Sequence, residues 1–181
     1  MRLQLLSRQL LKTQQNDRTL QTLARTFDVT QKRRLDLDNH LPYLVNRVGA
    51  KVAAIYTEET LVRERLSVEM WRVLAALAHE GNLRQVDLST RTSLDTSTMS
   101  RIVGRLVHMG LVTRSRSKTS SREVVVALSP QGDALVTRLI PIALDLEGSA
   151  IVGIPAKDVQ VLKRTLRQVF ENLTQGRRAR R

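Results

Sequence analysis

The most regular pattern of apolar and polar positions lies between residues 83 and 106. It predicts a short helix over about 83–92 and, after a tight turn, a second helix that begins near Asp95. Apolar residues define the inner side of each helix: Leu83, Val86 and Leu88 in the first, then Met99, Val103 and Leu106 in the second. A short side-chain oxygen can accept a backbone N–H bond at a helix start, so Asp95 is suited to cap the second helix.

The outer side of the second helix is polar and free of acids. It carries Ser97, Thr98, Arg101 and Arg105. Hydroxyl and guanidinium groups can reach both base edges and phosphates, so this surface is typical of a helix that enters the major groove of DNA. The alternative is an ordinary surface helix whose polar residues are solvated.

The residues that follow favour the first interpretation. Gly110 ends the second helix, and the segment from Leu111 predicts an extended strand. Residues 113–122 hold four cations and no acids: Arg114, Arg116, Lys118 and Arg122. The β-branched run 123–128 predicts a second strand. Two helices, a strand, a basic hairpin and a strand make a winged helix-turn-helix, in which the basic hairpin is the wing.

Two helices are predicted before this module. The pattern indicates a long helix over 36–65 and a shorter one from the capping residue Ser67 to about His79, closed by Gly81. The apolar face of the long helix contains Leu41, Leu44, Val45, Val48, Val52 and Ile55. That of the shorter helix contains Val68, Trp71, Leu74 and Leu77.

Two more helices are predicted after the wing. Ser129 and Pro130 are typical of a helix start, and Pro141 predicts a kink or break inside that helix. Its apolar stripe is Leu135, Leu139, Ile142 and Leu146. Gly148 and Gly153 indicate a loop, and Pro155 begins the last helix. A heptad seam runs along this last helix: Val159, Leu162, Leu166, Val169 and Leu173. The seam favours a helical partner, and the alternative is a helix packed on its own core.

Three stretches of the chain resemble the MarR family of bacterial transcription regulators. They are Asp95-Thr96-Ser97-Thr98-Met99-Ser100-Arg101, Leu106-Val107-His108-Met109-Gly110-Leu111-Val112 and Leu128-Ser129-Pro130-Gln131-Gly132. The resemblance covers roughly residues 38–174. Two departures concern the wing, where the family's Asp-x-Arg reads Ser120-Ser121-Arg122, and the turn, where a common Gly is Ser93.

The resemblance implies a mainly α homodimer in which the first and last helices of two subunits intertwine. Two-fold symmetry would place two recognition helices about one DNA turn apart, so a pseudo-palindromic operator is expected. The expected divisions begin with a basic N-terminal extension over residues 1–34 and an N-terminal helix of a dimerisation region over 35–66. A winged helix-turn-helix follows over 67–128, then C-terminal helices of the dimerisation region over 129–175 and a basic tail over 176–181.

The charge of the chain points to a polyanionic partner. The 181 residues carry a net charge of +13, and residues 83–122 hold eight cations and two acids, a net of 8 − 2 = +6. Aromatic residues make up only 3% of the chain. Proteins that bind single-stranded nucleic acid stack bases on aromatic side chains, so this low content disfavours such a function. A basic architectural or RNA-associated protein without operator preference is the alternative. The uncharged Ser and Thr residues at the start of the recognition helix argue against it.

Residues 1–34 stand apart, with eight cations and two acids. Three interpretations remain open: a basic arm that packs on the dimer or touches DNA, a poorly ordered extension, and a targeting peptide.

Several function classes are disfavoured. The chain has no cysteine, which excludes a disulfide or a thiol-based redox switch. His40, His79 and His108 are far apart and lack metal-ligand spacing, so neither a metal, a cofactor nor an enzymatic activity is expected. No apolar run has the length to cross a bilayer and no secretory signal is visible, so a soluble, cytoplasmic protein without a membrane partner is expected.

The expected DNA contacts follow from position on the recognition helix and wing. Ser97, Thr98 and Arg101 are the expected base readers, and Arg101 is suited to a bidentate guanine contact. Thr96, Ser100 and Arg105 are expected at phosphates. Arg122 is expected in the minor groove, with Arg116 and Lys118 beside it. A single arginine in this region is at least as suited to phosphate as to base.

The resemblance also implies a small-molecule effector, such as an aromatic acid, between the dimer helices and the DNA module. The candidate lining residues are His40, Tyr43, Asn46, Arg47, Trp71 and Arg72. An aromatic ring beside a guanidinium suits a planar carboxylate. For Trp71, a core role is the alternative, and the positive charge also suits a CoA thioester. The expected protein is a repressor released from double-stranded DNA by such a small anionic effector.

Overall fold

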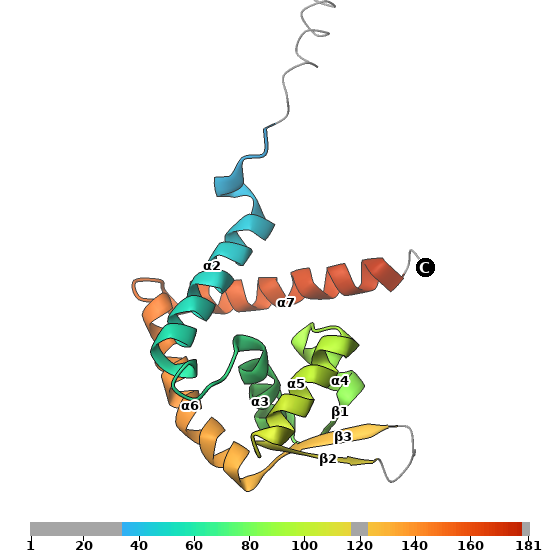
Figure 1. Ribbon diagram of the computed structural model, residues 1–181. Helices are drawn as coiled ribbons and strands as arrows, with labels where there is room; N and C mark the ends of the chain where they lie inside the picture. Colours follow the sequence, from blue (N-terminus) through green and yellow to red (C-terminus); the bar gives the residue numbers. More distant parts are fainter. Residues whose placement is uncertain (1–33, 117–122, 179–181) are drawn as a thin grey trace, which may run out of the picture. The chain divides into compact units, whose positions relative to one another are not determined.

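The computed structural model describes residues 34–116 and 123–178, and their side chains as far as Gln175 (Figure 1). In chain order the elements are η1 (Leu37–Asn39), α2 (Leu41–Tyr56), η2 (Thr57–Leu61), α3 (Val68–Glu80), β1 (Leu83–Arg84), α4 (Gln85–Thr92), α5 (Thr96–His108), β2 (Val112–Arg116), β3 (Val124–Leu128), α6 (Pro130–Ala150) and α7 (Ala156–Arg178). The predicted class is confirmed: the protein is mainly α, with a small antiparallel sheet. The chain divides after Arg47 into two units, and each is described by itself.

The single helix predicted over 36–65 is wrong at both ends. In the first unit, Asp36 caps the 3-10 turn η1 through a hydrogen bond from the Asp38 N–H to Oδ1 (3.2 Å), and α2 begins only at Leu41. In the second unit, α2 passes into the π-helix η2, and Arg65 adopts a left-handed conformation at φ 56°. The Leu66 N–H then bonds the Leu61 carbonyl at 2.9 Å, which reverses the chain and buries both leucines.

The core of the second unit gathers around α3. Ser67 caps this helix as predicted, with its Oγ accepting from the Met70 N–H at 3.3 Å. Leu74 and Leu77 of the predicted face are buried, whereas Val68 and Trp71 are only half-buried. Met70 and Val73 take the remaining core positions, so the buried face is turned from the predicted one.

A three-stranded antiparallel sheet lies against this core, with strand order β1-β3-β2. The predicted hairpin is confirmed, since β2 and β3 pair from Val112↔Leu128 to Arg116↔Val124. The strand β1 was not predicted: Leu83 pairs with Val126 and does not begin a helix, so α4 starts at Gln85. Val86, expected on the inner face of that helix, is 53% exposed.

The turn after β3 fixes the start of α6. Ser129 caps the helix as predicted, with its Oγ accepting from the Gly132 N–H at 2.9 Å and donating to the Gly110 carbonyl at 2.6 Å. The Ser129 N–H also bonds the Leu111 carbonyl at 3.1 Å. These bonds draw the first turn of α6 onto the segment that follows α5. A Cβ at Gly132 would lie 1.9 Å from the Leu111 carbonyl oxygen, so only glycine fits there.

Of the kink or break predicted at Pro141, no break occurs. α6 runs unbroken past this exposed residue, so the carbonyl deprived of its helical bond can meet water. Gly148 lies inside α6, and the loop is confined to residues 151–155, where Gly153 has φ 79°.

The predicted seam of α7 is largely uncovered in the single chain. Val159 is buried, but Leu162, Leu166 and Leu173 are 50%, 37% and 67% exposed, respectively. Most of the seam is therefore not packed on the chain's own core.

The Gly132 contact leads to a stability prediction. Gly132→Ala should lower the free energy of unfolding by roughly 1–3 kcal/mol, because the added methyl group forces backbone apart in a packed turn. Urea unfolding curves measure the change. Gly148→Ala is the matched control: it lies in the same helix with open space around its Cβ, and should leave stability unchanged or raise it by up to about 1 kcal/mol. Equal midpoints for wild type and Gly132→Ala would contradict this prediction.

Candidate nucleic-acid interface

Two helices, α4 and α5, meet at a tight turn on the surface of the second unit (Figure 1). Ser93 ends α4 in the left-handed conformation, at φ 56°, and the Leu94 N–H bonds the Ser89 carbonyl at 3.1 Å. Leu94 is half-buried beneath the turn, and Asp95 begins the next helix. The serine at this position therefore adopts the backbone conformation that glycine favours, and the turn forms without glycine.

Burial of one face orients α5. Met99, Val103 and Leu106 are fully buried, and Ile102 is half-buried beside them, as the sequence predicts. Because these residues recur over three successive turns, the opposite side of the helix must face outward.

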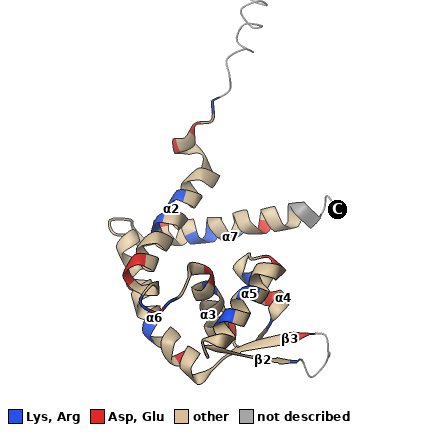
Figure 2. Ribbon diagram, in the orientation of Figure 1, with Lys and Arg blue, Asp and Glu red and all other residues tan. Residues whose placement is uncertain are grey.

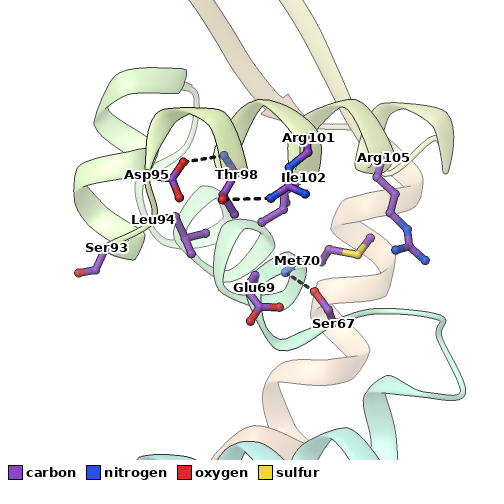
Figure 3. A pocket seen from close by; sticks show the side chains of 10 residues that line it. All are labelled: Ser67, Glu69, Met70, Ser93, Leu94, Asp95, Thr98, Arg101, Ile102 and Arg105. Carbon is purple, nitrogen blue, oxygen red and sulfur yellow. Dashed lines mark hydrogen bonds between the residues drawn. The ribbon is translucent and has the colours of Figure 1, made fainter.

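Asp95 is the N-cap of α5, as predicted (Figure 3). Its Oδ1 accepts from the Ser97 hydroxyl at 2.5 Å and from the Thr98 N–H at 2.9 Å. These two bonds hold the pKa of the Asp95 carboxyl far below its ordinary range. The Ser97 hydroxyl proton is thus engaged, which leaves its oxygen lone pairs facing solvent.

The polar residues predicted to contact DNA lie on the surface of α5. Thr96, Ser97, Ser100, Arg101 and Arg105 are exposed, and Thr98 is half-buried. Arg101 donates from Nη2 to the Thr98 hydroxyl at 3.2 Å, a bond that directs the guanidinium toward the start of the helix (Figure 3).

A hollow of about 480 Å³ lies beside this surface, between α5 and the start of α3. Thr98, Arg101 and Arg105 line it from α5, and Ser67 and Glu69 from α3 (Figure 3). A hydrogen bond with Ser67 lowers the pKa of Glu69, which keeps a negative charge on the α3 side of the hollow. The two arginines therefore share the hollow with two acids, Glu69 and the N-cap residue Asp95.

The basic hairpin is described as far as Arg116 on one strand and from Glu123 on the other. Arg114 and Arg116 of β2 are exposed. Lys118 and Arg122, predicted at the wing, lie outside the described residues. The position of the lysines and arginines that the structure describes is shown in Figure 2.

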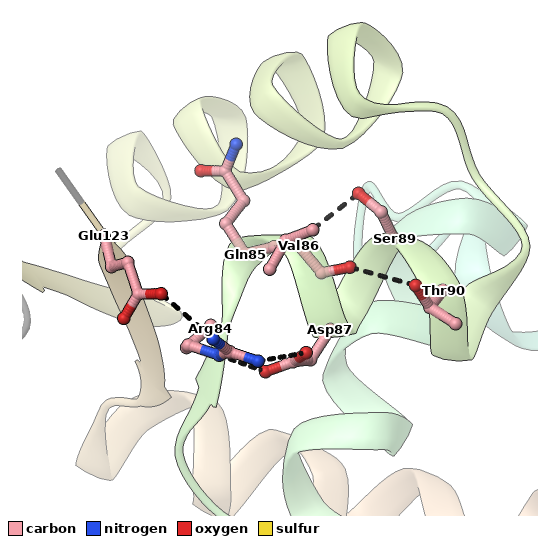
Figure 4. Close-up of polar contacts among 7 residues, drawn as sticks. All are labelled: Arg84, Gln85, Val86, Asp87, Ser89, Thr90 and Glu123. Carbon is pink, nitrogen blue, oxygen red and sulfur yellow. Dashed lines mark hydrogen bonds and ion pairs between the residues drawn. The ribbon is translucent and has the colours of Figure 1, made fainter.

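Sequence reasoning missed an ion-pair cluster at the end of this hairpin that adjoins the wing segment 117–122. Arg84 donates from Nε and Nη2 to the two Asp87 oxygens at 2.6 and 2.9 Å, and from Nη1 to Glu123 at 2.9 Å (Figure 4). The carboxylates raise the pKa of Arg84, and the guanidinium lowers that of Asp87. The Arg84–Asp87 spacing of three residues was visible in the sequence. The Glu123 partner, 39 residues away, was not.

The six candidate effector-binding residues fall in two groups. His40, Tyr43, Asn46 and Arg47 belong to the first unit, where the Arg47 guanidinium lies 5.5 Å from the centre of the Tyr43 ring, a cation–π distance.

Trp71 and Arg72 lie on α3 of the second unit. Trp71 packs edge-on against Tyr56, with ring centres 5.4 Å apart, and the Tyr56 hydroxyl donates to the Leu139 carbonyl at 3.0 Å. The half-buried Trp71 thus joins the edge of the core. With the exposed Arg72 and with Arg91 it also lines a second hollow of about 480 Å³. Trp71 therefore serves packing and still borders open space.

Residues 34–116 and 123–178 contain no group of three metal-ligating side chains. None of the helices in that part of the chain is long and apolar enough to cross a membrane.

These elements define a winged helix-turn-helix protein: a capped outward-facing helix α5, its partner α4, and an antiparallel hairpin that follows them. Comparison with known proteins gives the family. The MarR family model matches residues 66–124. The HTH-type transcriptional repressor IacR of Pseudomonas putida is 32% identical over 127 residues, which cover 68% of this chain and 76% of the repressor. The chain belongs to the MarR family and is a transcriptional regulator; its relatives are regulators and not enzymes.

Solved structures agree with this assignment. BpsR of Bordetella bronchiseptica, whose DNA binding is regulated by 6-hydroxynicotinic acid, is 27% identical with a TM-score of 0.64 and covers 71% of this chain and 97% of its own. A MarR family regulator from Silicibacter pomeroyi is 29% identical with a TM-score of 0.70, covering 77% and 96%.

The Asp95 cap leads to a pH-dependent stability prediction. Asp95→Ala should lower the midpoint of thermal unfolding at pH 7, because two hydrogen bonds at the start of α5 are lost. Since folding lowers the Asp95 pKa, the stabilisation is complete above the unfolded pKa of about 3.9 and is lost as the pH falls below it.

The difference between wild type and Asp95→Ala should therefore shrink as the pH is lowered from 5 toward 2. Circular dichroism melts across this range measure it. Asp95→Asn is the control, because its side chain still accepts the Thr98 N–H but does not titrate. A difference between wild type and Asp95→Ala that is the same at every pH would show that the cap is not ionised.

Proposed function

We propose that this regulator is a homodimeric repressor that binds a pseudo-palindromic operator in double-stranded DNA and is released by a small anionic effector. The observation that carries the proposal is the outer face of α5. It presents Ser97, Thr98 and Arg101 at the first turns of a helix whose opposite face is fully buried. A rigidly held helix start with hydroxyl and guanidinium groups suits major-groove readout.

The residues have different roles in this proposal. Ser97, Thr98 and Arg101 contact base edges, and Arg101 binds a guanine with both terminal nitrogens. Thr96, Ser100 and Arg105 contact phosphates and set the register of the helix on the duplex. At the wing, Arg116 is joined by two residues outside the described ranges, Lys118 and Arg122, with Arg122 in the minor groove.

Exposed apolar stripes support a dimer. The seam of α7 leaves Leu162 half exposed and Leu173 more so, and α2 exposes Leu41, Val45 and Val48. A second copy of the chain would remove this apolar surface from water. In this proposal residues 35–66 and 129–175 form the dimerisation region, residues 67–128 bind DNA, residues 1–34 form a basic arm and residues 176–181 a basic tail.

An aromatic acid is the proposed effector class. The regulation of BpsR by 6-hydroxynicotinic acid supports it by similarity. The paired Arg47 and Tyr43 side chains, and separately Trp71 with Arg72, offer the ring and guanidinium chemistry that a planar carboxylate needs. A CoA thioester is the other effector class that the positive charge suits.

A second candidate function is a basic architectural protein without operator preference. The net charge of +13 favours it, because neutralising phosphates gives affinity for any duplex. It differs from the first proposal in one measurable property: such a protein binds operator and scrambled DNA equally.

The operator proposal predicts a sequence preference that depends on Arg101. By fluorescence anisotropy at physiological salt, wild type should prefer DNA from upstream of its own gene over scrambled duplex by about a thousandfold. Arg101→Ala should reduce operator affinity about tenfold to a hundredfold, because a bidentate base contact is lost.

Arg164→Ala is the matched control, because it removes the same charge from an exposed position on α7 and should leave the preference intact. Equal affinity of wild type for both duplexes would favour the architectural function, and a preference in Arg101→Ala as large as that of wild type would refute the assignment of α5. Adding aromatic acids or their CoA esters to the operator complex tests release.

The dimer proposal predicts that a charge on the α7 seam separates the subunits. Leu162→Glu should shift the mass in sedimentation equilibrium from dimer toward monomer, because a buried carboxylate without a partner is costly. Gln160→Glu adds the same charge two residues away, on the other side of the helix, and should remain dimeric. A Leu162→Glu variant as dimeric as Gln160→Glu would place the subunit contact elsewhere.

A further inference from the structure

The ion-pair cluster of Arg84, Asp87 and Glu123 joins three elements of the DNA-binding module. Arg84 belongs to β1 and Asp87 to the first turn of α4, and Glu123 is the residue just before β3 (Figure 4). The guanidinium binds Asp87 with two nitrogens and Glu123 with the third, so all three of its nitrogens are engaged. A planar fork held in this way fixes direction as well as distance.

The contact with Glu123 is made at the end of β3 that adjoins the wing segment 117–122. β1 contributes only two residues, pairing Leu83 with Val126 and Arg84 with Val125. Glu123 lies two residues beyond Val125, toward the wing. The Arg84 side chain therefore adds a contact between β1 and the β3 side of the hairpin, beyond the last backbone pair of these two strands. The Arg84–Glu123 bond therefore links β1 to the residue that adjoins the wing segment 117–122.

The cluster also lies beside the start of the recognition helix. A hollow of about 230 Å³ is lined by Arg84 and Glu123 on one side and by Thr96, the first residue of α5, on another. The wing end of β3 and the N-terminal end of α5 are thus neighbours across this hollow.

A contribution to folding stability does not explain why these three residues are joined. The side chains of Arg84, Asp87 and Glu123 are 48%, 42% and 35% exposed, and exposed ion pairs contribute little to folding. Their geometric effect is larger, because a contact at the wing end of the hairpin, far from the Val112↔Leu128 pair, restrains the angle of the hairpin more than a contact near that pair would.

We propose that Arg84 is a positioning residue for DNA binding: through Glu123 it holds the β2–β3 hairpin at the angle to α4 and α5 at which wing and recognition helix meet one duplex together. This inference rests on the proposed operator binding. It assigns to Glu123, an acid in a DNA-binding region, a role that favours operator binding although its charge repels phosphate.

The sign of the charge makes the proposal testable. Glu123→Gln removes a negative charge, so a purely electrostatic role predicts tighter binding to any duplex. The positioning role predicts the reverse for the operator: about threefold to fivefold weaker binding, with affinity for scrambled duplex unchanged or higher.

Asp145→Asn is the matched control. It removes the same charge from an exposed position on α6, outside the cluster, and keeps every bond of Arg84, so operator affinity should be unchanged or slightly higher. Arg84→Gln should weaken operator binding as Glu123→Gln does, and the double variant should be no weaker than Arg84→Gln alone, because both changes break one contact. Thermal melts should show all four variants folded.

The probes are a duplex selected by the wild-type protein from a random-sequence pool and a scrambled duplex of equal composition. Operator binding by Glu123→Gln as tight as wild type, or an equal loss in Asp145→Asn, would overturn the positioning role while leaving operator recognition in place. A wild-type protein that does not distinguish the two duplexes would overturn both proposals.

Discussion

Burial of the inner face of α5 is the constraint on which the DNA-binding module depends. Met99, Val103 and Leu106 have no exposed surface, and they recur over three turns of the helix. Interiors are close-packed, so a helix anchored in this way cannot rotate about its axis without opening voids. The outward direction of Ser97 and Arg101 is therefore set by residues that never meet solvent.

The features predicted correctly are those decided by local sequence. Ser67, Asp95 and Ser129 were each identified as helix caps, because a cap needs only a side-chain oxygen and N–H groups two or three residues on. The features that were missed depend on distant partners. Leu83 is a strand residue because Val126 lies opposite it, and the reversal at Arg65 follows from burial of Leu61 and Leu66 together.

The same distinction holds for the candidate site. The exposed residues of α5 follow from helical periodicity, since the polar face must lie opposite the apolar one. The Arg84–Glu123 bond does not, because it joins residues that only the sheet β1-β3-β2 brings together. For the effector residues, the sequence could indicate chemical types such as Tyr43 beside Arg47. It gave no means of finding that Trp71 rests on Tyr56.

Geometry also changes how the charge of the module is counted. The sequence gives residues 83–122 a net charge of +6, but extending the segment by one residue adds Glu123, and 8 − 3 gives +5. Arg84 is engaged with two acids and Arg91 pairs with Glu80 at 2.5 Å. Within the described part of this segment, the arginines outside these pairs are Arg101, Arg105, Arg114 and Arg116, two on α5 and two on β2. Because the unpaired charge is divided between helix and hairpin, attraction to phosphate is strongest when both meet the same duplex. In the proposed operator complex, the angle between these two elements therefore contributes to affinity together with the number of charges.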